Sequence, residues 1–292
     1  MVISHILGGL GNQMFQYAAG KALSRTLSCP LLLDIHDFGC YELHNGFEID
    51  RVFSAPVKVA KKSDVAQVLG WRSGKLMRRL LRRMQFPLLN GPNLVIEPHF
   101  NYWSGLKDVS SMTYLMGYWQ SEKYFKDFEL QIKSDFSFTP TLSGGNLQVS
   151  RRIQTCNSVA LHVRRGDYVT DRATAKILNL CSIQYYQEAI DRIARRIHRP
   201  IFYIFSDDQR WVRNNLKVSF PVEYIERNDG PQSYIDMQLM SLCKHQIIAN
   251  SSFGWWGAWL NANPDKIVIA PRNWFCNHFN DDDLIPQEWE RL

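Results

Sequence analysis

The 292-residue sequence lacks the features that mark disulfide-rich, zinc-finger and membrane-spanning proteins. Its six cysteines are widely spaced, with no CxxC pair and no histidine at zinc-finger spacing. It holds no run of about 18 to 20 apolar residues that could span a bilayer. The opening residues, MVISHILGGLGNQMF, lack the basic lead of a signal peptide. We therefore expect a cytoplasmic protein with reduced thiols.

The composition is that of a folded enzyme, with 45% hydrophobic and 21% charged residues and no low-complexity tract. Thirty-four Lys and Arg against 28 Asp and Glu give a net charge of +6. Such a balance favours an anionic partner such as a nucleotide, a nucleic acid or a membrane surface. Because no base-reading motif accompanies the basic residues, we do not expect nucleic acid to be the partner.

Short β-branched runs alternate with longer helical patterns, which is typical of parallel α/β architecture. The first such unit has a strand over residues 2–7, a glycine turn, a helix and a second strand ending near Asp34. Residues 55–114 show no clear pattern. The run LSGGNLQVS, residues 142–150, has the composition of a linker. We therefore predict one domain over residues 1–145 and a second over residues 146–292.

The second domain contains five strand-like runs and two clear helical patterns, SIQYYQEAIDRIARRI and SYIDMQLMSLCK. The five runs are residues 158–163, 201–206, 222–225, 246–250 and 266–270. In open parallel sheets, ligands bind beyond the carboxyl ends of the strands. The residues that follow these runs are therefore the candidates for a binding site.

The run SVALHVRRGDY ends a predicted strand in basic residues. Strand alternation places His162 and Arg164 on one side of the sheet and Arg165 on the other. A guanidinium group suits phosphate oxygens, and a neighbouring imidazole can recognise a base or a ribose. The alternative is that Arg164 or Arg165 only pairs with Asp167.

The run SSFGWWGAWLN combines two hydroxyls with three tryptophans directly after a predicted strand. Helical spacing of the aromatic residues puts Ser251 and Ser252 at a helix N-terminus, where serine caps and backbone N–H groups bind phosphate. The tryptophans are expected to pack the helix on its sheet. Phe253, beside the phosphate position, is expected to contact the ligand.

Two further strand ends carry polar residues. IFSDD places Asp207 and Asp208 where they could accept hydrogen bonds from a ribose or a guanine, or cap the next helix. A pair of carboxylates without a third ligand is weak support for a metal site.

The turn GGLGNQ resembles a dinucleotide-binding fingerprint, but Met14 stands at the third glycine position. Its glycines with Asn12 and Gln13 would instead allow close approach of an anion or a sugar.

These motifs together resemble glycosyltransferase family eleven, the α-1,2-fucosyltransferases. The resemblance runs through GGLGNQMFQYA, GYWQSEKYF, LHVRRGDY, IFSDD, DMQLMSLCKHQIIANSSFGWWGAWLN and VIAPRNWF, and is weakest over residues 38–113. It implies a GT-B fold, with two facing Rossmann-like domains that enclose a cleft between their parallel sheets. It also implies inverting transfer of fucose from GDP-fucose to a terminal galactose of a glycan, without a metal or other cofactor.

The resemblance also implies roles for the motif residues. Arg164 would hold the β-phosphate of GDP, while His162 and Asp207 would recognise guanine. Asn12 would lie near the fucose and the incoming hydroxyl. The remaining donor contacts would be Gly9, Gly11, Arg165, Ser251, Ser252 and Phe253.

The general base is not identified by any motif. A carboxylate or histidine near the acceptor would serve, and Asp34, His36 and Asp37 follow the second predicted strand.

Two other classes of protein remain as alternatives. One is an NAD-dependent oxidoreductase, and the other is a sugar-binding module that uses aromatic surfaces without catalysis.

The stretch WRSGKLMRRLLRRM, residues 71–84, has basic residues and no acidic ones. On a helix at about 100° per residue, its apolar side chains fall within an arc of roughly 140° and its basic ones opposite. The apolar set is Leu76, Met77, Leu80, Leu81 and Met84, and the basic set is Arg72, Lys75, Arg78, Arg79, Arg82 and Arg83. The stretch is therefore either an ordinary surface helix or a helix that lies on an anionic membrane.

Overall fold

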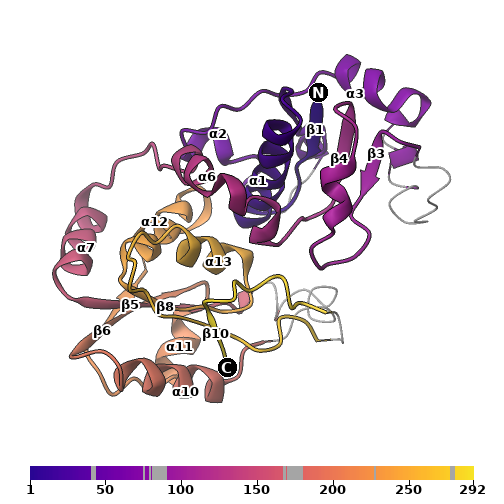
Figure 1. Ribbon diagram of the computed structural model, residues 1–292. Coiled ribbons are helices and arrows are strands. Elements are labelled where there is room, and N and C mark those ends of the chain that lie inside the picture. Colours follow the sequence, from indigo (N-terminus) through magenta and orange to yellow (C-terminus); the bar gives the residue numbers. More distant parts are fainter. Residues whose placement is uncertain are drawn as a thin grey trace. The chain divides into compact units, whose positions relative to one another are not determined.

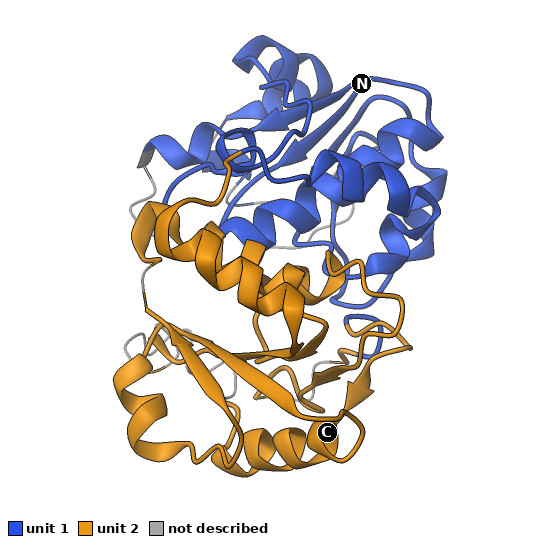
Figure 2. Cartoon of the chain, turned by 90° about the vertical axis from the view of Figure 1, so that its left-hand side faces the viewer, with its two compact units in different colours: residues 1–139, 282–284 blue, residues 140–281, 285–292 orange. Residues whose placement is uncertain are grey.

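The computed structural model describes residues 1–40, 44–74, 76–78, 80, 91–166, 169, 180–226, 228–276 and 280–292. The chain divides into two compact units, which Figure 2 colours separately. Unit 1 is Met1–Thr139 with Asp282–Leu284, and unit 2 is Pro140–Asp281 with Ile285–Leu292. The division lies close to the predicted one, but the predicted linker is wrong. Residues Gly144–Thr155 form helix α7, because Val149 and Ile153, four residues apart, bury one helical face.

Unit 1 is built on a four-stranded parallel sheet in the order β2-β1-β4-β3 (Figure 1). The strands are β1 (Val2–His5), β2 (Leu31–Asp34), β3 (Leu94–Ile96) and β4 (Thr113–Met116). The helices are α1 (Leu10–Thr26), α2 (Ile49–Val52), α3 (Lys62–Leu69) and α6 (Glu129–Asp135). Short 3-10 turns cover His36–Cys40, Gly70–Ser73, Ser104–Asp108, Glu122–Tyr124 and Lys126–Phe128.

Alternation along β1 decides which layer each side chain meets. Ile3 joins an apolar cluster with Val65 and Val68 of α3, whereas the hydroxyl of Ser4 donates to the carbonyl of Gln16 on α1 at 2.9 Å. His5, two residues beyond Ile3, therefore points to the α3 side of the sheet. The carboxyl end of β1 thus carries a polar side chain over an otherwise apolar face.

Unit 2 is built on a six-stranded sheet in the order β10-β9-β8-β5-β6-β7, in which every described pair is parallel. The strands are β5 (Asn157–Val163), β6 (Pro200–Ser206), β7 (Val222–Ile225), β8 (His245–Ile247), β9 (Val268–Ala270) and β10 (Glu290–Arg291). With α7 come α10 (Ile183–Ala194), α11 (Gln209–Asn215), α12 (Tyr234–Leu242), α13 (Ser252–Trp259) and a 3-10 turn at Gly230–Gln232.

Each face of the unit 2 sheet has its own apolar cluster. Leu161 and Val163 of β5 pack with Ile190 of α10 on one face. Ala160 of the same strand packs with Leu239 of α12 on the other face. The predicted alternation of β5 is therefore confirmed, and His162 lies on the face that α12 covers.

The basic segment agrees only in part with the predicted amphipathic helix: residues 76–78 and 80 are helical and Met77 packs against an apolar cluster, but two other residues do not lie as predicted. Arg78, predicted on the exposed basic face, is 9% exposed and donates to Asp34 and Tyr114, whereas Leu76, predicted on the apolar face, is 82% exposed. The physical reason is that Asp34 is fully buried, and a buried carboxylate needs a cationic or hydrogen-bonding partner. Lys75, Arg79, Leu81, Arg82, Arg83 and Met84 lie outside the described residues. Within the described ranges, no helix combines the length and apolar content needed to cross a bilayer.

Candidate active site

His162 lies near the carboxyl end of β5, packed beneath the start of α13. Its ring centroid is 6.0 Å from that of Phe253, and a Cβ added to Gly254 would clash with its Nδ1. Burial, with a smaller contribution from the charge of Arg164, lowers the pKa of His162 to about 3. Nδ1 is buried and has no hydrogen-bond partner among the described residues. The ring is therefore neutral at physiological pH, with one nitrogen left for a ligand.

Arg164 follows β5 directly and is part of an ordered turn. Its guanidinium lies 3.1 Å from Asp207 Oδ2. The same carboxylate accepts the backbone N–H groups of Arg165 and Gly166, both at 2.9 Å. Because both oxygens of Asp207 are engaged, the contacts favour a role in holding the turn over the predicted recognition of guanine. Asp167, the alternative partner of the arginines, lies outside the described residues.

Arg165 is held by protein groups on both sides. Its Nε lies 3.3 Å from Asp208 Oδ2, and its guanidinium stacks 3.8 Å from the ring centroid of Trp211. Asp208 also caps α11 by accepting the N–H of Trp211 at 3.0 Å. These contacts argue against the predicted role of Arg165 in donor binding, and they give Asp208 the capping role expected for one of the two aspartates.

Helix α13 begins where the sequence predicted. Ser251 occupies the N-cap position, is 7% exposed and makes no capping hydrogen bond with its side chain. The hydroxyl of Ser251 and the first N–H groups of the helix are therefore available to an anion. Trp255, Trp256 and Trp259 are buried and pack against one another, so the expected structural role of the tryptophans is confirmed.

Asp236 is a perturbed carboxyl that the sequence reasoning missed. It lies on α12, which packs against α13, and it accepts a hydrogen bond of 2.7 Å from Asn228 Nδ2. Burial raises its pKa to about 7, against the opposing effect of this hydrogen bond. The available signal was an acidic residue inside the apolar helical pattern YIDMQLMSL. Perturbed carboxyls of this kind are candidates for functional groups.

In unit 1, the glycine turn joins β1 to α1. Gly8 has a φ of +83°, which favours glycine, and Gly9 is the N-cap of α1, while Gly11 lies buried in its first turn. Asn12 is half-buried, and its Oδ1 accepts a hydrogen bond of 2.7 Å from Gln120 Nε2. The amide of Asn12 is thereby fixed with its NH2 group away from Gln120.

Gln13 is fully buried, and the structure does not support its predicted approach to a ligand. Its Nε2 donates to the carbonyls of Gly8 and Gly46, and its Oε1 accepts the N–H of Glu48 at 2.9 Å. A side chain with three internal hydrogen bonds and no exposed surface organises the turn itself.

The turn after β4 positions Gln120, which the sequence reasoning also missed. The carboxylate of Glu97 accepts the N–H groups of Tyr118 at 2.7 Å and Trp119 at 2.9 Å. Trp119 is buried with a φ of +56°, an unfavourable conformation that these contacts hold in place. No sequence signal identified Glu97, because it lies in the region without a clear pattern.

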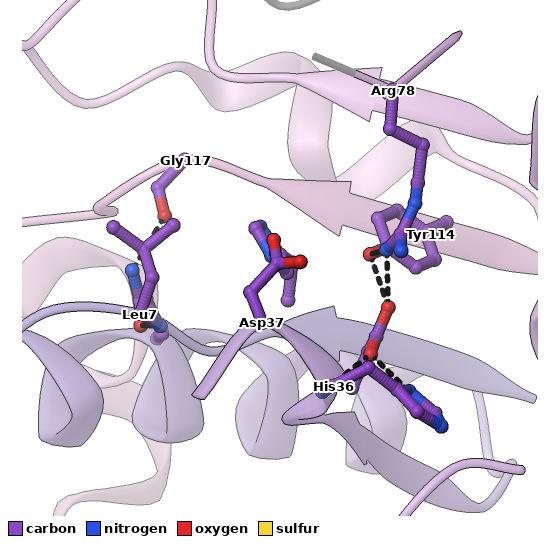
Figure 3. Close-up of polar contacts among 9 residues, drawn as sticks. Leu7, His36, Asp37, Arg78, Tyr114 and Gly117 are labelled. Atoms are coloured by element: carbon purple, nitrogen blue, oxygen red, sulfur yellow. Dashed lines mark hydrogen bonds and ion pairs between the residues drawn. The ribbon is translucent and has the colours of Figure 1, made fainter. Parts of the chain in front are cut away.

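A polar cluster, which consists of His5, Asp34, His36, Asp37, Arg78 and Tyr114, lies at the carboxyl ends of the unit 1 strands (Figure 3). Asp34 accepts the hydroxyl of Tyr114 at 2.6 Å, Nδ1 of His36 at 2.6 Å and a hydrogen bond from Arg78. Asp37 contacts Nε2 of His5 at 3.0 Å. The side chain of Gln16 accepts the N–H of Leu7 at 2.9 Å and donates to the carbonyl of Gly117 at 3.0 Å, which ties the end of β1 to that of β4. Leu7 and Gly117 are labelled in Figure 3.

The cluster distinguishes the three predicted bases from one another. Burial alone would raise the pKa of Asp34, but the hydrogen bonds from Tyr114 and His36 and the charge of Arg78 together lower it. Asp34 is therefore an anion with no exposed surface, which argues against direct contact with an acceptor. The side chains of His36 and Asp37 are 31% and 34% exposed. Among the described residues, no His, Cys, Asp and Glu side chains form a group of three or more that could hold a metal ion.

Comparison with known proteins identifies the family. The model of the family described as "Glycosyl transferase family 11" matches residues 97–292. The chain is 34% identical over 300 residues to an Escherichia coli alpha-1,2-colitosyltransferase, covering 100% of this chain and 99% of that protein. It is 31% identical over 302 residues to the Escherichia coli O-antigen biosynthesis glycosyltransferase WbnK, covering 99% of each. It is also 29% identical over 188 residues to galactoside alpha-(1,2)-fucosyltransferase 1 of Leontocebus fuscicollis, covering 60% of this chain and 51% of that protein.

Among solved structures, NodZ alpha-1,6-fucosyltransferase soaked with GDP-fucose aligns over 89% of this chain and 91% of its own, with a TM-score of 0.51 and 16% identity. This likeness concerns the fold, and it confirms the predicted α/β class with parallel sheets. The protein is a glycosyltransferase, so the alternatives of an NAD-dependent oxidoreductase and a non-catalytic sugar-binding module are not supported. The chain belongs to glycosyl transferase family 11.

Proposed function

We propose that the protein transfers L-fucose from GDP-fucose to the 2-hydroxyl of a terminal galactose, with inversion at the anomeric carbon. The observation that carries this proposal is the end of β5, where Asp207 holds Arg164 and a neutral His162 lies beside the start of α13. The names of the alpha-1,2-linking relatives support the same reaction.

In the proposed donor site, unit 2 binds GDP. Arg164 contacts the β-phosphate, and the first N–H groups of α13 with Ser251 and Ser252 contact the diphosphate. The neutral ring of His162 offers its uncommitted nitrogen to the base or ribose, and Phe253 packs beside it. As the bond between the sugar and the phosphate breaks, negative charge grows on GDP. Fixed donors aimed at that charge lower the barrier.

In the proposed acceptor half, unit 1 supplies Asn12. Its Oδ1 is occupied by Gln120, so the NH2 group is the part that would contact the fucose or the incoming hydroxyl. Glu97 fixes the turn that carries Gln120 by accepting two of its backbone N–H groups. Because Gln120 donates to Asn12, Glu97 influences the position of Asn12 indirectly. A preset amide costs no reorganisation when the substrate binds.

We further propose that the reaction needs no divalent metal, because Arg164 and the helix N-terminus can balance the charge of the diphosphate. The test is to incubate the protein with GDP-fucose and lactose in excess EDTA and to follow GDP release. Release that depends on lactose and persists in EDTA is expected. Release only after magnesium is added would contradict the metal-free mechanism.

A second donor deserves equal testing, because the relative named as a colitosyltransferase matches the full length of this chain. Colitose is fucose without its 3-hydroxyl. A site built to hydrogen-bond that hydroxyl rejects the deoxy sugar by several orders of magnitude, whereas a site without such contacts discriminates weakly. The ratio of kcat/KM for GDP-fucose and GDP-colitose with the same acceptor decides between the donors.

We also propose that the protein works in the cytoplasm, in peripheral contact with anionic membrane. The five cysteines whose pairing the structure describes are free thiols, as expected in a reducing compartment. Trp71 and Leu76 are 66% and 82% exposed, beside a strongly basic stretch of sequence. Exposed apolar side chains flanked by basic residues favour an anionic lipid surface.

Vesicle sedimentation tests the membrane proposal. At low salt, the protein should pellet with anionic vesicles and not with neutral ones. Trp71→Ser with Leu76→Ser should reduce pelleting, as should replacement of Arg79, Arg82 and Arg83 by Gln. Leu130→Ser is the matched control, since Leu130 is 85% exposed on α6. If all variants pellet equally with anionic vesicles, the proposed membrane contact is wrong.

A further inference from the structure

The polar cluster of unit 1 contains two pairs of histidine and aspartate, which differ in exposure. His5 is 5% exposed, and its Nδ1 is buried without a described partner. His36 lies in the turn after β2 with 31% of its side chain exposed. Only the second pair therefore presents an imidazole to a molecule that arrives from solvent.

The contacts of Asp34 determine how the ring of His36 is held. Asp34 Oδ1 accepts both the backbone N–H of His36 at 3.1 Å and its Nδ1 at 2.6 Å. Because Asp34 is an anion and can only accept, Nδ1 carries the proton. Nε2 is then the nitrogen with a free lone pair. No hydrogen bond of Nε2 occurs within the described residues.

Asp34 is itself fixed from the far side. Its Oδ2 accepts hydrogen bonds from Tyr114 on β4 and from Arg78, and Arg78 also donates to the hydroxyl of Tyr114. A carboxylate with this many donors cannot rotate freely, so the imidazole that it holds has one orientation. An imidazole with a buried anion on Nδ1 and a free Nε2 is the arrangement by which hydrolytic triads abstract a hydroxyl proton.

We propose that His36 is the general base that takes the proton from the acceptor hydroxyl, with Asp34 as the positioning residue that sets its tautomer. This inference rests on the proposed transfer function. The proton of the galactose 2-hydroxyl moves to Nε2 while the oxygen forms a bond to the anomeric carbon of the sugar. The bond from that carbon to the β-phosphate breaks, and its electron pair leaves with GDP. His36 later returns the proton to water.

The location fits this role. His36 lies two residues after β2, at the carboxyl end of the parallel sheet, where ligands of open α/β folds bind. The charged and titratable groups around it are Asp34 on β2, Arg78, Tyr114 on β4, Asp37 in the same turn and His5 on β1. Arg78 is the cationic partner of Asp34, because it donates a hydrogen bond to the same carboxylate.

The main test is His36→Gln, assayed with GDP-fucose and lactose. General base catalysis contributes roughly a hundredfold to ten-thousandfold, so kcat should fall by at least about a hundredfold. GDP affinity, measured by calorimetry, should stay within about twofold because unit 2 binds the nucleotide. His99→Gln is the matched control, since His99 is exposed in unit 1 and bonds a backbone carbonyl through Nδ1.

Two further variants make the assignment falsifiable. Tyr114→Phe removes one donor to Asp34 but keeps the ring packing, and it should lower kcat without changing GDP affinity. Asp37→Asn should lower kcat less than His36→Gln does. The proposal is overturned if His36→Gln keeps kcat within about threefold, or if Asp37→Asn causes the larger loss. Absence of transfer by the wild type with both GDP-fucose and GDP-colitose would instead refute the proposed function, and the base assignment with it.

Discussion

The polar residues at the strand ends of the two units are used in different ways. In unit 2, Nδ1 of His162 is buried without a partner among the described residues, and the side chain of Ser251 makes no capping hydrogen bond. In unit 1, Asn12 and Asp34 are bonded to side chains from distant parts of the chain. A buried polar atom without a partner costs free energy, so a ligand that supplies the partner would stabilise His162, and the same holds for Nδ1 of His5 in unit 1.

The difference suggests a division of labour. Unit 2 resembles a binding site that is completed by its ligand, whereas unit 1 resembles a preset frame that orients a few exposed groups. Variants in unit 2 should therefore change nucleotide affinity, and variants in unit 1 should change turnover at constant affinity. Arg164, for which we propose a contact with the leaving group, should change both nucleotide affinity and turnover.

The largest effect is expected for Arg164→Ala. Removal of a donor from the developing charge should lower kcat by roughly a hundredfold or more. Arg164→Lys should recover only part of this loss, because an ammonium cannot replace the planar fork. Steady-state kinetics with GDP-fucose and lactose measure both. Near-normal turnover of the alanine variant would remove the leaving-group role.

A smaller effect is expected for Gly254→Ala, because the added methyl would displace the ring of His162. We expect GDP affinity to fall by roughly tenfold and stability to drop by about 1 to 3 kcal/mol, as for overpacked cores. Calorimetric titration and thermal melting measure the two changes. Gly39→Ala is the control, since no atom of the described residues lies within 4 Å of its added Cβ. If GDP affinity is unchanged in Gly254→Ala, His162 does not contribute to the donor site.

Gln120→Met should disturb only the unit 1 side. It removes the hydrogen bond to Asn12 at similar volume, so kcat should fall by about tenfold, equivalent to the loss of about 1.4 kcal/mol in the transition state. GDP affinity should not change. If Gln120→Met instead weakened GDP binding with kcat intact, the division between the two units would be wrong.

A separate prediction concerns Asp236 and the pH dependence of the stability of unit 2. Its pKa is raised from 3.8 to about 7, so the folded state binds this proton more tightly than the unfolded state. The stabilisation is complete below about pH 4 and is lost as pH rises to about 7. Asp236→Asn should therefore gain in free energy of unfolding relative to wild type as pH rises from 5 to 8. Urea unfolding at the two pH values measures the difference, and an equal difference at both would contradict the raised pKa.

Local patterns predicted much of unit 2. The strand at Val222–Ile225 and the helix at Ser252–Trp259 lie where periodicity placed them, because each is defined by its own residues. Strands β3 and β4 were not predicted, since they are three and four residues long within a stretch without a clear pattern. Strand β4 pairs with β1 and strand β3 pairs with β4, and such pairing is not visible in a local window.

The partners of the site residues were also beyond local patterns. Arg78 and Tyr114 lie 44 and 80 positions from Asp34 along the chain, and Gln120 lies 108 positions from Asn12. The basic run around Arg78 predicted an exposed face, but the buried charge of Asp34 made one arginine an internal counterion. A pattern records which side chains are charged, and only the fold determines which of them must meet.

The most direct test of fucose transfer is the structure of the product. The wild-type protein should be incubated with GDP-fucose and lactose in EDTA, and the purified trisaccharide examined by NMR. We expect one new α-linked fucose, attached to O2 of the galactose residue, together with an equal amount of GDP. A β linkage, attachment at another hydroxyl, or consumption of GDP-fucose without any trisaccharide would contradict inverting α-1,2 transfer.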